Sequence, residues 1–272
     1  MKKNLILIIF LLVVLVVVGI IFNNSKPKEE VKVNEEPSTQ TEGLIVAGSY
    51  ETKVLNPDDP YVTFDVKYPS FKNADASFNS SIEKLIKTQM DDHKKASQEY
   101  WQARIDTEMK GENIPNIPTK EDKLSFIANF TIVQSNSSYI SFIENYGGFS
   151  GGAHGYEINT SFNYDVANKK IITLKDLFPN NPNYLIYLST TAREYLKSQF
   201  TTVNEEDKKN SDPQALKEYV DNIISTIESG TESTEENFST FTFTGDKIKI
   251  YFAQYQVGPY SIGMPEVEID RE

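Results

Sequence analysis

The chain has no cysteine and only two histidines, His93 and His154, among its 272 residues. Without cysteine there is no disulfide framework, no lipoprotein acylation site and no cysteine-based zinc site. The two histidines lie far apart in sequence and form neither an H-E-x-x-H motif nor another zinc-ligand spacing, and carboxylates alone would suit only Ca²⁺ or Mg²⁺. We therefore expect no metal and no cofactor, and a fold stabilised by an ordinary hydrophobic core.

Basic residues are also scarce, because 27 Lys and Arg stand against 39 Asp and Glu and give a formal net charge of −12. A chain this acidic is repelled by a phosphate backbone, so nucleic acid is not expected as a partner. An acidic surface can attract cations or cationic proteins, although acidity also serves solubility alone. The charge allows a basic partner without identifying one.

Long hydrophobic runs are limited to residues 5–22, directly after Lys2, Lys3 and Asn4. A helix of this length spans about 27 Å, close to the ~30 Å hydrocarbon core of a bilayer and longer than the core of a cleaved signal peptide. No A-x-A cleavage site follows it. The run predicts a transmembrane signal anchor. The positive-inside rule then leaves residues 1–4 in the cytoplasm and places the rest outside a cell membrane that is crossed once.

Residues 23–43 are polar, charged and interrupted by proline. They carry too little apolar surface to offset the entropy lost on ordering, which predicts a disordered stalk. The remaining residues are enough for one large or two small domains. We divide them into an N-terminal α/β module at residues 44–120 and a C-terminal α+β domain at residues 121–272.

Hydrophobic periodicity predicts the elements of the first module. Val62, Phe64 and Val66 alternate with polar residues, as in a half-buried strand. A helical pattern follows, with Ser77 as its N-cap, and runs to about Met109. The stretch "GENIPNIPTKED" then interrupts regular structure.

The second domain shows strand patterns first, helix patterns next, and strands again at its end. Strands are expected at residues 124–132, 139–143 and 156–166, a helix at 183–200, and a second helix opened by Asp212 and Pro213. A hairpin about residues 245–246 and a final strand near 266–269 complete it. Strands grouped apart from helices predict an α+β fold in which an antiparallel sheet packs against helices, and not a βαβ array.

A glycine-rich motif, "NYGGFSGGAHGYEIN" at residues 145–159, invites comparison with serine hydrolases because it contains G-x-S-x-G. An α/β-hydrolase elbow needs a helix after the serine and a histidine later in the chain. A strand pattern follows instead, and no histidine lies beyond His154. A trypsin-like order would use His93, which falls on the inner face of the predicted helix. We interpret the motif as a connection between two strands of one sheet, with His154 hydrogen-bonded to turn backbone.

Three stretches resemble known families. "GGAHGYEINTSFNYDVANKKIITLKDLF" at residues 151–178 and "YQVGPYSIGMPEVEI" at residues 255–269 resemble the extracytoplasmic domain of RsiV-type anti-sigma factors. "VKYPSFKNADASFNSSIEKLIK" at residues 66–87 is similar to a module that accompanies that domain and also precedes the catalytic domain of PdaC-type peptidoglycan deacetylases. The resemblance covers nearly all of residues 46–270.

The resemblance implies a function as well as a fold. In the anti-sigma factors the exterior region binds lysozyme, and in the deacetylases the chemistry belongs to a separate domain. Residues 1–4 are too short to bind a sigma factor, and no deacetylase domain follows in this sequence. The leading hypothesis is a membrane-anchored exterior binding domain without its own catalysis, which recognises lysozyme or peptidoglycan. An enzyme or enzyme accessory acting on wall glycan, and a purely structural envelope protein, remain as alternatives.

Seven residues carry the resemblance at its turns and are the candidate binding residues; none is a candidate catalytic residue. Glycine and proline at turns also serve backbone geometry alone, so a structural role is the alternative for each. The candidates are Gly151, Gly152, His154, Gly258, Pro259, Tyr260 and Gly263.

Overall fold

The computed structural model describes residues 45–107, 115–151 and 154–271. The predicted anchor and stalk, at residues 1–43, lie outside this part of the chain, as does the candidate Gly152. Across the described ranges, every helix is too short or too polar to cross a bilayer. Residues 41–272 form one compact unit.

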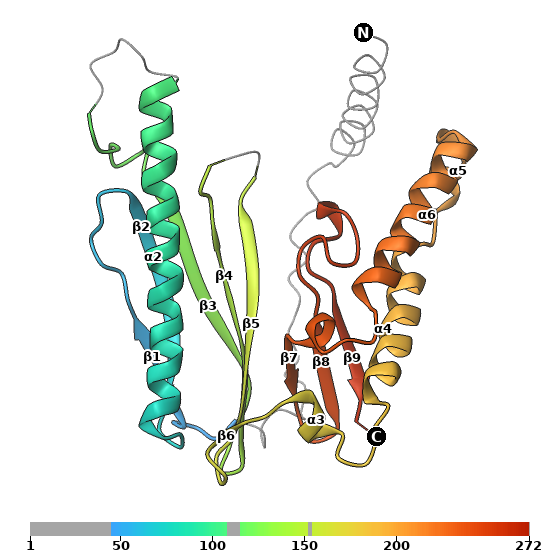
Figure 1. The fold of residues 1–272 in the computed structure, drawn as a ribbon, viewed down its shortest axis with the longest axis horizontal. Coiled ribbons are helices and arrows are strands. Elements are labelled where there is room, and N and C mark those ends of the chain that lie inside the picture. The colour runs from blue at the N-terminus through green and yellow to red at the C-terminus, as the bar shows by residue number, and fades with distance from the viewer. Residues whose placement is uncertain (1–44, 108–114, 152–153, 272) are drawn as a thin grey trace. The chain divides into compact units, whose positions relative to one another are not determined.

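The first half of this unit is a six-stranded sheet with one long helix along it (Figure 1). Its strands lie side by side in chain order. The elements are β1 (Tyr50–Val54), β2 (Val62–Phe71), α2 (Ala76–Thr107), β3 (Leu124–Ser135), β4 (Tyr139–Gly148), β5 (Tyr156–Asp165) and β6 (Lys170–Ile171).

The expected α+β class is confirmed, but the sheet is mixed and not antiparallel. β2 and β3 pair in parallel, with Val62 opposite Leu124. They can do so because α2 carries the chain back along the sheet between them, which makes β2–α2–β3 a βαβ unit. The predicted helix is confirmed, and the structure shows that it is the crossover connection between two parallel strands. The prediction that excluded βαβ connections was therefore wrong at this place.

The N-cap of the long helix α2 lies two residues earlier than its sequence pattern suggested. Asp75, and not Ser77, is the N-cap, since Asp75 Oδ1 accepts a hydrogen bond of 2.9 Å from the backbone N–H of Phe78. The helix buries a stripe that contains apolar residues and also the polar side chains of Gln89, His93 and Ser97.

The second half holds a three-stranded antiparallel sheet of order β7-β8-β9 with α4 against it (Figure 1). Asp212 caps α6 as expected, since Asp212 Oδ2 accepts from the N–H of Ala215 at 2.9 Å. The elements are α3 (Leu174–Leu177), α4 (Tyr184–Phe200), α5 (Glu205–Asn210), α6 (Pro213–Gly230), η1 (Glu236–Phe238), β7 (Phe241–Phe243), β8 (Lys247–Tyr251), η2 (Tyr260–Ile262) and β9 (Glu266–Asp270).

Two hydrophobic cores correspond to the two sheets. One lies between α2 and the six-stranded sheet and includes Ile82, Phe126 and Phe142. The other lies between the three-stranded sheet and the helices after residue 172, and includes Leu188 and Phe252. The division predicted at residue 120 falls between α2 and β3, two parts of the same βαβ unit.

Side chains of the first sheet hold the outer edge of β7. Ser141 Oγ accepts from the N–H of Phe243 at 3.0 Å, and Asn163 Nδ2 donates to the carbonyl of Phe241 at 2.7 Å. A β-bulge between Ile132 and Gln134 shifts the register, so that Gln134 lies opposite Ser141. From there Gln134 Nε2 donates to the carbonyl of Phe243 at 2.8 Å. The two sheets are thereby fastened by directional bonds.

Candidate functional site

The glycine-rich motif forms the tip of the β4–β5 hairpin. Gly148 pairs with Tyr156 across the two strands, which confirms the interpretation of the motif as a connection within one sheet. Gly151 has φ of +93° and lies against Tyr100 of α2, whose ring would be 2.2 Å from an added Cβ. Tyr100 also meets the ring of Phe149 edge-on, with centroids 6.3 Å apart. The helix thus fixes where the tip lies.

Ser150 has no histidine partner among the described residues. His93 Nδ1 is hydrogen-bonded to the Tyr156 hydroxyl at 2.8 Å, and His154 Nδ1 lies 2.7 Å from the carbonyl oxygen of Gly155. Both expectations for the histidines are confirmed: His93 is a buried residue of the helix face, and His154 bonds turn backbone. Nothing in this geometry activates the serine.

The second predicted turn is part of the loop between β8 and β9. Pro259 precedes the short helix η2, which starts at Tyr260, and Gly263 ends it with φ of +74°. Gly258 lies under Ile262, whose Cδ1 would be 2.3 Å from an added Cβ. Tyr255 adopts φ of +66°, a conformation uncommon for residues with a side chain. These positions shape a compact loop that presents two tyrosines.

The two predicted turns meet in space. His154 Nε2 lies 3.0 Å from the hydroxyl oxygen of Tyr255, and the rings of His154 and Tyr260 have centroids 4.2 Å apart with a tilt of 31°. Tyr255 and Tyr260 are 53% and 41% exposed, and His154 is exposed too. We call these three residues the aromatic corner. Their three aromatic rings form one solvent-exposed surface, with polar atoms at the ring edges.

A groove of about 350 Å³ continues from the aromatic corner through Tyr255. One wall is α6 and the other is the loop after β8. Tyr219 on the helix and Tyr255 on the loop are both about half exposed, and none of the described residues that line the groove is charged. The lining residues are Tyr219, Asn222, Ile223, Thr226, Tyr255, Gly258 and Pro259.

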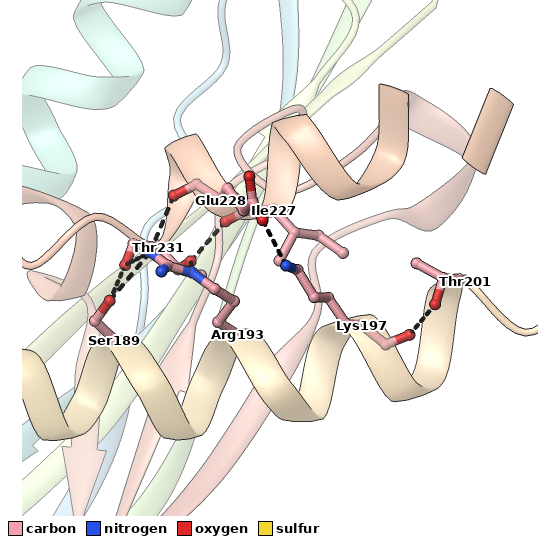
Figure 2. Close-up of polar contacts among 7 residues, drawn as sticks. All are labelled: Ser189, Arg193, Lys197, Thr201, Ile227, Glu228 and Thr231. Atoms are coloured by element: carbon pink, nitrogen blue, oxygen red, sulfur yellow. Dashed lines mark hydrogen bonds and ion pairs between the residues drawn. The ribbon is translucent and has the colours of Figure 1, made fainter. Parts of the chain in front are cut away.

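A polar network behind the groove fixes the end of α6 (Figure 2). Arg193 on α4 donates from Nε to Thr231 Oγ1 at 3.0 Å and from Nη2 to the carbonyls of Glu228 and Thr231 at 3.3 and 3.2 Å. Ser189 Oγ donates to the same Thr231 carbonyl at 2.5 Å. Arg193 therefore satisfies carbonyls that the helix C-terminus leaves without partners.

The loop with Tyr255 is tied to the same helix end. Gln256 Nε2 donates to the carbonyls of Gly230 and Asn237, both at 3.0 Å. Gly230 is needed there because an added Cβ would lie 2.0 Å from the Gln256 carbonyl oxygen. Both walls of the groove are thus held at one point, the C-terminus of α6.

A separate polar cluster is buried between α2 and β4. Gln89 Nε2 donates to Glu144 Oε2 at 3.2 Å, while Gln89 Oε1 and Glu144 Oε1 are buried and have no protein partner among the described residues. Burial raises the pKa of Glu144 to about 7, against a smaller opposing effect of the Gln89 hydrogen bond. The carboxyl is 2% exposed. We call Gln89 and Glu144 the buried acid pair.

The pKa values of tyrosine and histidine side chains near the buried acid pair are also shifted. Burial raises the pKa of Tyr156 to about 12 and, with the charge of Glu144, raises the pKa of Tyr146. Burial lowers the pKa of His93, with the backbone carbonyl of Ser125 opposing the change. In the ranges that the structure describes, no three His, Asp or Glu side chains gather closely enough to hold a metal ion.

The structure brings together four of the six described candidates. His154 and Tyr260 form the aromatic corner, and Gly258 and Pro259 line the groove. Gly151 lies against α2, and Gly263 ends η2. Sequence reasoning missed Tyr219, Asn222 and Tyr255 as site residues. Tyr255 lay inside a quoted motif, whereas nothing in the helix pattern distinguished Tyr219 and Asn222 from an ordinary solvated helix face.

Two family profiles match separate parts of the chain. The family described as deacetylase PdaC matches residues 55–157, and the family described as a protein of unknown function, DUF3298, matches residues 175–272. The predicted similarity to the PdaC-type module is confirmed, while the RsiV-type assignment stays a prediction. The aromatic corner draws His154 from the first matched region and its two tyrosines from the second.

One curated relative shares most of this chain. The peptidoglycan-N-acetylmuramic acid deacetylase PdaC of Bacillus subtilis (strain 168) is 28% identical over 252 residues, which are 92% of this chain and 45% of the relative. The chain thus spans less than half the length of that protein.

One solved structure supports the fold alone, and a second is less similar. A DUF3298 family member from Bacteroides fragilis NCTC 9343 has a TM-score of 0.50 at 20% identity, over 82% of this chain and 91% of that one. A DUF3298 family protein from Pseudomonas aeruginosa PAO1 has a TM-score of 0.49 at 14% identity, over 81% and 90% of the two chains.

Proposed function

We propose that this chain is a membrane-anchored, extracytoplasmic module that binds cell-wall glycan without catalysing a reaction. The observation that carries the proposal is the aromatic corner, three exposed rings continuous with an open, uncharged groove. The flat C–H face of a pyranose ring packs against aromatic faces, and its hydroxyls bond the polar tips of Tyr and His. Small-molecule sites are typically concave, mostly apolar and lined with a few polar groups, as this groove is.

The comparisons support a wall glycan as the ligand class. The similar protein from Bacillus subtilis is named for an activity on peptidoglycan. The site lies where the regions that match PdaC and DUF3298 meet, so glycan recognition would use both. Anchoring through residues 5–22 would keep this surface next to the wall. A variant that lacks residues 1–22 should leave the membrane fraction, and its retention there would contradict the anchor.

Cosedimentation with purified, insoluble peptidoglycan tests the binding. The unaltered chain should pellet in a saturable manner, and Tyr255→Ala and Tyr260→Ala should each weaken binding severalfold. Tyr195→Ala is the matched control, because Tyr195 is 46% exposed on α4 and does not line the groove. If all three variants pellet like the original chain, the aromatic corner is not the site. If the original chain does not pellet, peptidoglycan is not the ligand.

A second candidate ligand is a cationic protein such as lysozyme. It is supported by the resemblance to RsiV-type exterior domains and by the net charge of −12. Binding driven by that charge would weaken strongly as salt is raised from 50 to 500 mM, because exposed charges are screened. Micromolar lysozyme binding that survives high salt would show a shaped interface instead. No binding at low salt would remove this candidate.

Catalysis on wall glycan is the alternative, and the buried acid pair is the feature that suggests it. A carboxyl with a pKa of about 7 has the proton affinity of a general acid. Glycoside hydrolysis, however, needs two carboxyls that flank an accessible bond, and Glu144 is only 2% exposed. Burial therefore favours a structural role. Release of soluble sugar from peptidoglycan by the original chain but not by Glu144→Gln would reverse this assignment.

A further inference from the structure

We propose that the groove takes a neutral N-acetylated amino sugar and that Asn222 recognises its acetamido group. This inference rests on the proposed glycan-binding function and narrows it to one kind of sugar residue. Wall glycan offers three chemistries at the amino-sugar positions: a neutral acetamide, a free ammonium after deacetylation, and the carboxylate of a lactyl ether on muramic acid. The groove discriminates among them by its lining.

The lining disfavours both charged groups. Among the described residues that line the groove there is neither a carboxylate to pair with an ammonium nor a cation to pair with a carboxylate. A charged group taken from water into such a site loses hydration without gaining a partner, which costs more than the burial of a neutral amide. The acidic chain as a whole, at −12, disfavours a carboxylate further.

Asn222 supplies the complementary polar group. Its side chain is exposed on α6, and its carboxamide, with an N–H₂ donor and a carbonyl acceptor, has no hydrogen bond to another described residue. An acetamide presents the matching acceptor and donor, so the two amides can exchange two hydrogen bonds. Thr226 next to it already donates to the backbone carbonyl of Asn222 at 2.9 Å. On this wall the Asn222 amide and the Tyr219 hydroxyl keep free pairing capacity, and only the amide matches both the donor and the acceptor of an acetamide.

Apolar contacts complete the recognition. Ile223 lies at the base of the groove and Pro259 on the facing wall, which gives the acetyl methyl group an apolar contact. Tyr219 and Tyr255 stand on opposite walls and offer rings to the sugar face. The volume of about 350 Å³ lies near the lower end of the ~300–1,000 Å³ range of small-ligand sites, suited to one or two sugar residues.

Calorimetric titration of the full chain in detergent with three trisaccharides tests the inference. The probes are the trimer of N-acetylglucosamine, the trimer of glucosamine, and cellotriose, which has hydroxyls at the same positions. The N-acetylated trimer should bind at least tenfold more tightly than either of the others. Equal binding of all three would overturn the acetamide inference and leave the glycan-binding function standing. Binding of none of them, with no binding to peptidoglycan, would overturn both.

The variant Asn222→Asp sharpens the test because it keeps the shape of the side chain. It removes the donor and adds a carboxylate, so the preference should shift at least tenfold toward the glucosamine trimer. Asn210→Asp, at the end of α5, is the control, since it adds the same charge to an exposed position outside the groove. The same shift in both variants would show a general charge effect and overturn the role of Asn222, as would an unchanged preference in a folded Asn222→Asp protein.

Discussion

The rings of His154 and Tyr260 are in contact, with centroids 4.2 Å apart and a tilt of 31°, although they come from the two regions of the chain that match different families. Neither ring is buried, so the stack adds little to the core of either half. The proposed function gives this exposed contact a role, because aromatic faces pack against sugar rings. Tyr255 extends it through its contact with His154 Nε2.

Replacing Tyr260 by Ala should therefore weaken glycan binding and leave stability unchanged. Loss of one stacking ring should cost about 0.5–1.5 kcal/mol of binding free energy. The exposed ring contributes little to folding, so the free energy of unfolding should change by less than about 0.5 kcal/mol. Titration with the N-acetylglucosamine trimer and urea unfolding measure the two effects. Tyr260→Phe should bind nearly as well as the original chain, and a loss equal to that of Ala would point to the hydroxyl instead.

Gly151 should not tolerate a side chain. Its φ of +93° is strained for any L residue, and an added Cβ would lie 2.2 Å from the Tyr100 ring. Gly151→Ala should lower the free energy of unfolding by about 1–3 kcal/mol, as measured by urea unfolding. Gly245→Ala is the control, because nothing lies within 4 Å of an added Cβ and its φ is not left-handed. Ser150→Ala should also be neutral, and a loss of binding there in a folded protein would reopen the question of Ser150.

The buried acid pair should make stability fall as pH rises. Between pH 4.5 and about 7 the native state holds a proton on Glu144 that the unfolded chain has lost. In this window the native state binds more protons than the unfolded chain. The contribution of Glu144 to the free energy of unfolding is therefore full below pH 4.5 and is lost as pH rises through 7. The loss amounts to at most about 3 kcal/mol. Urea unfolding at pH 5 and pH 8 measures it.

His93 acts in the opposite sense, so the pH effect of Glu144 must be isolated. Burial lowers the pKa of His93, and its contribution to stability is therefore present above the unfolded value of 6.5 and is lost as pH falls. Glu144→Gln keeps the shape of the side chain and removes its titration. The difference in unfolding free energy between the original chain and this variant should change with pH in favour of the variant above pH 7. A constant difference would show that Glu144 is ionised in the native state.

Arg193 should matter to the groove although it does not line it. Arg193→Met removes two partly buried hydrogen bonds to Thr231 and an exposed one to the Glu228 carbonyl, which together should cost about 1–3 kcal/mol of stability. Since the same helix end holds Gln256, trisaccharide affinity should fall as well. Lys197→Met is the control, because its ion pair with Glu228 is exposed and worth less than about 1 kcal/mol. Equal effects of the two variants would contradict the positioning role.

Elements were predictable where periodicity was strong. The alternation of Val62, Phe64 and Val66 gave β2, and Asp212 with Pro213 marked the start of α6, because both signals are local in sequence. The parallel pairing of β2 with β3 was missed because register depends on where a connecting helix returns the chain, which no local pattern encodes.

The site was predictable only in part. His154, Gly258, Pro259 and Tyr260 were singled out from two motifs, but their approach to one another is a property of the folded chain. The buried acid pair was not found from sequence. Gln89 occupies a helical position that a leucine would fill, and the strand expected at residues 139–143 stopped one residue before Glu144, which shares the core face of Ile140 and Phe142. Polar residues buried against each other look polar and exposed in sequence. The division of domains at residue 120 stays a prediction.

The contacts that hold β7 also protect its edge against pairing with strands of other protein molecules. β7 pairs with β8 on one side only, and on the other side its N–H and carbonyl groups at Phe241 and Phe243 are taken by side chains of the first sheet. An edge strand with unpaired backbone groups can pair with a strand of another molecule, and such pairing starts aggregation. Here side chains of the first sheet occupy that edge, so Asn163→Ala or Ser141→Ala should first make the purified protein aggregate, before any loss of ligand binding.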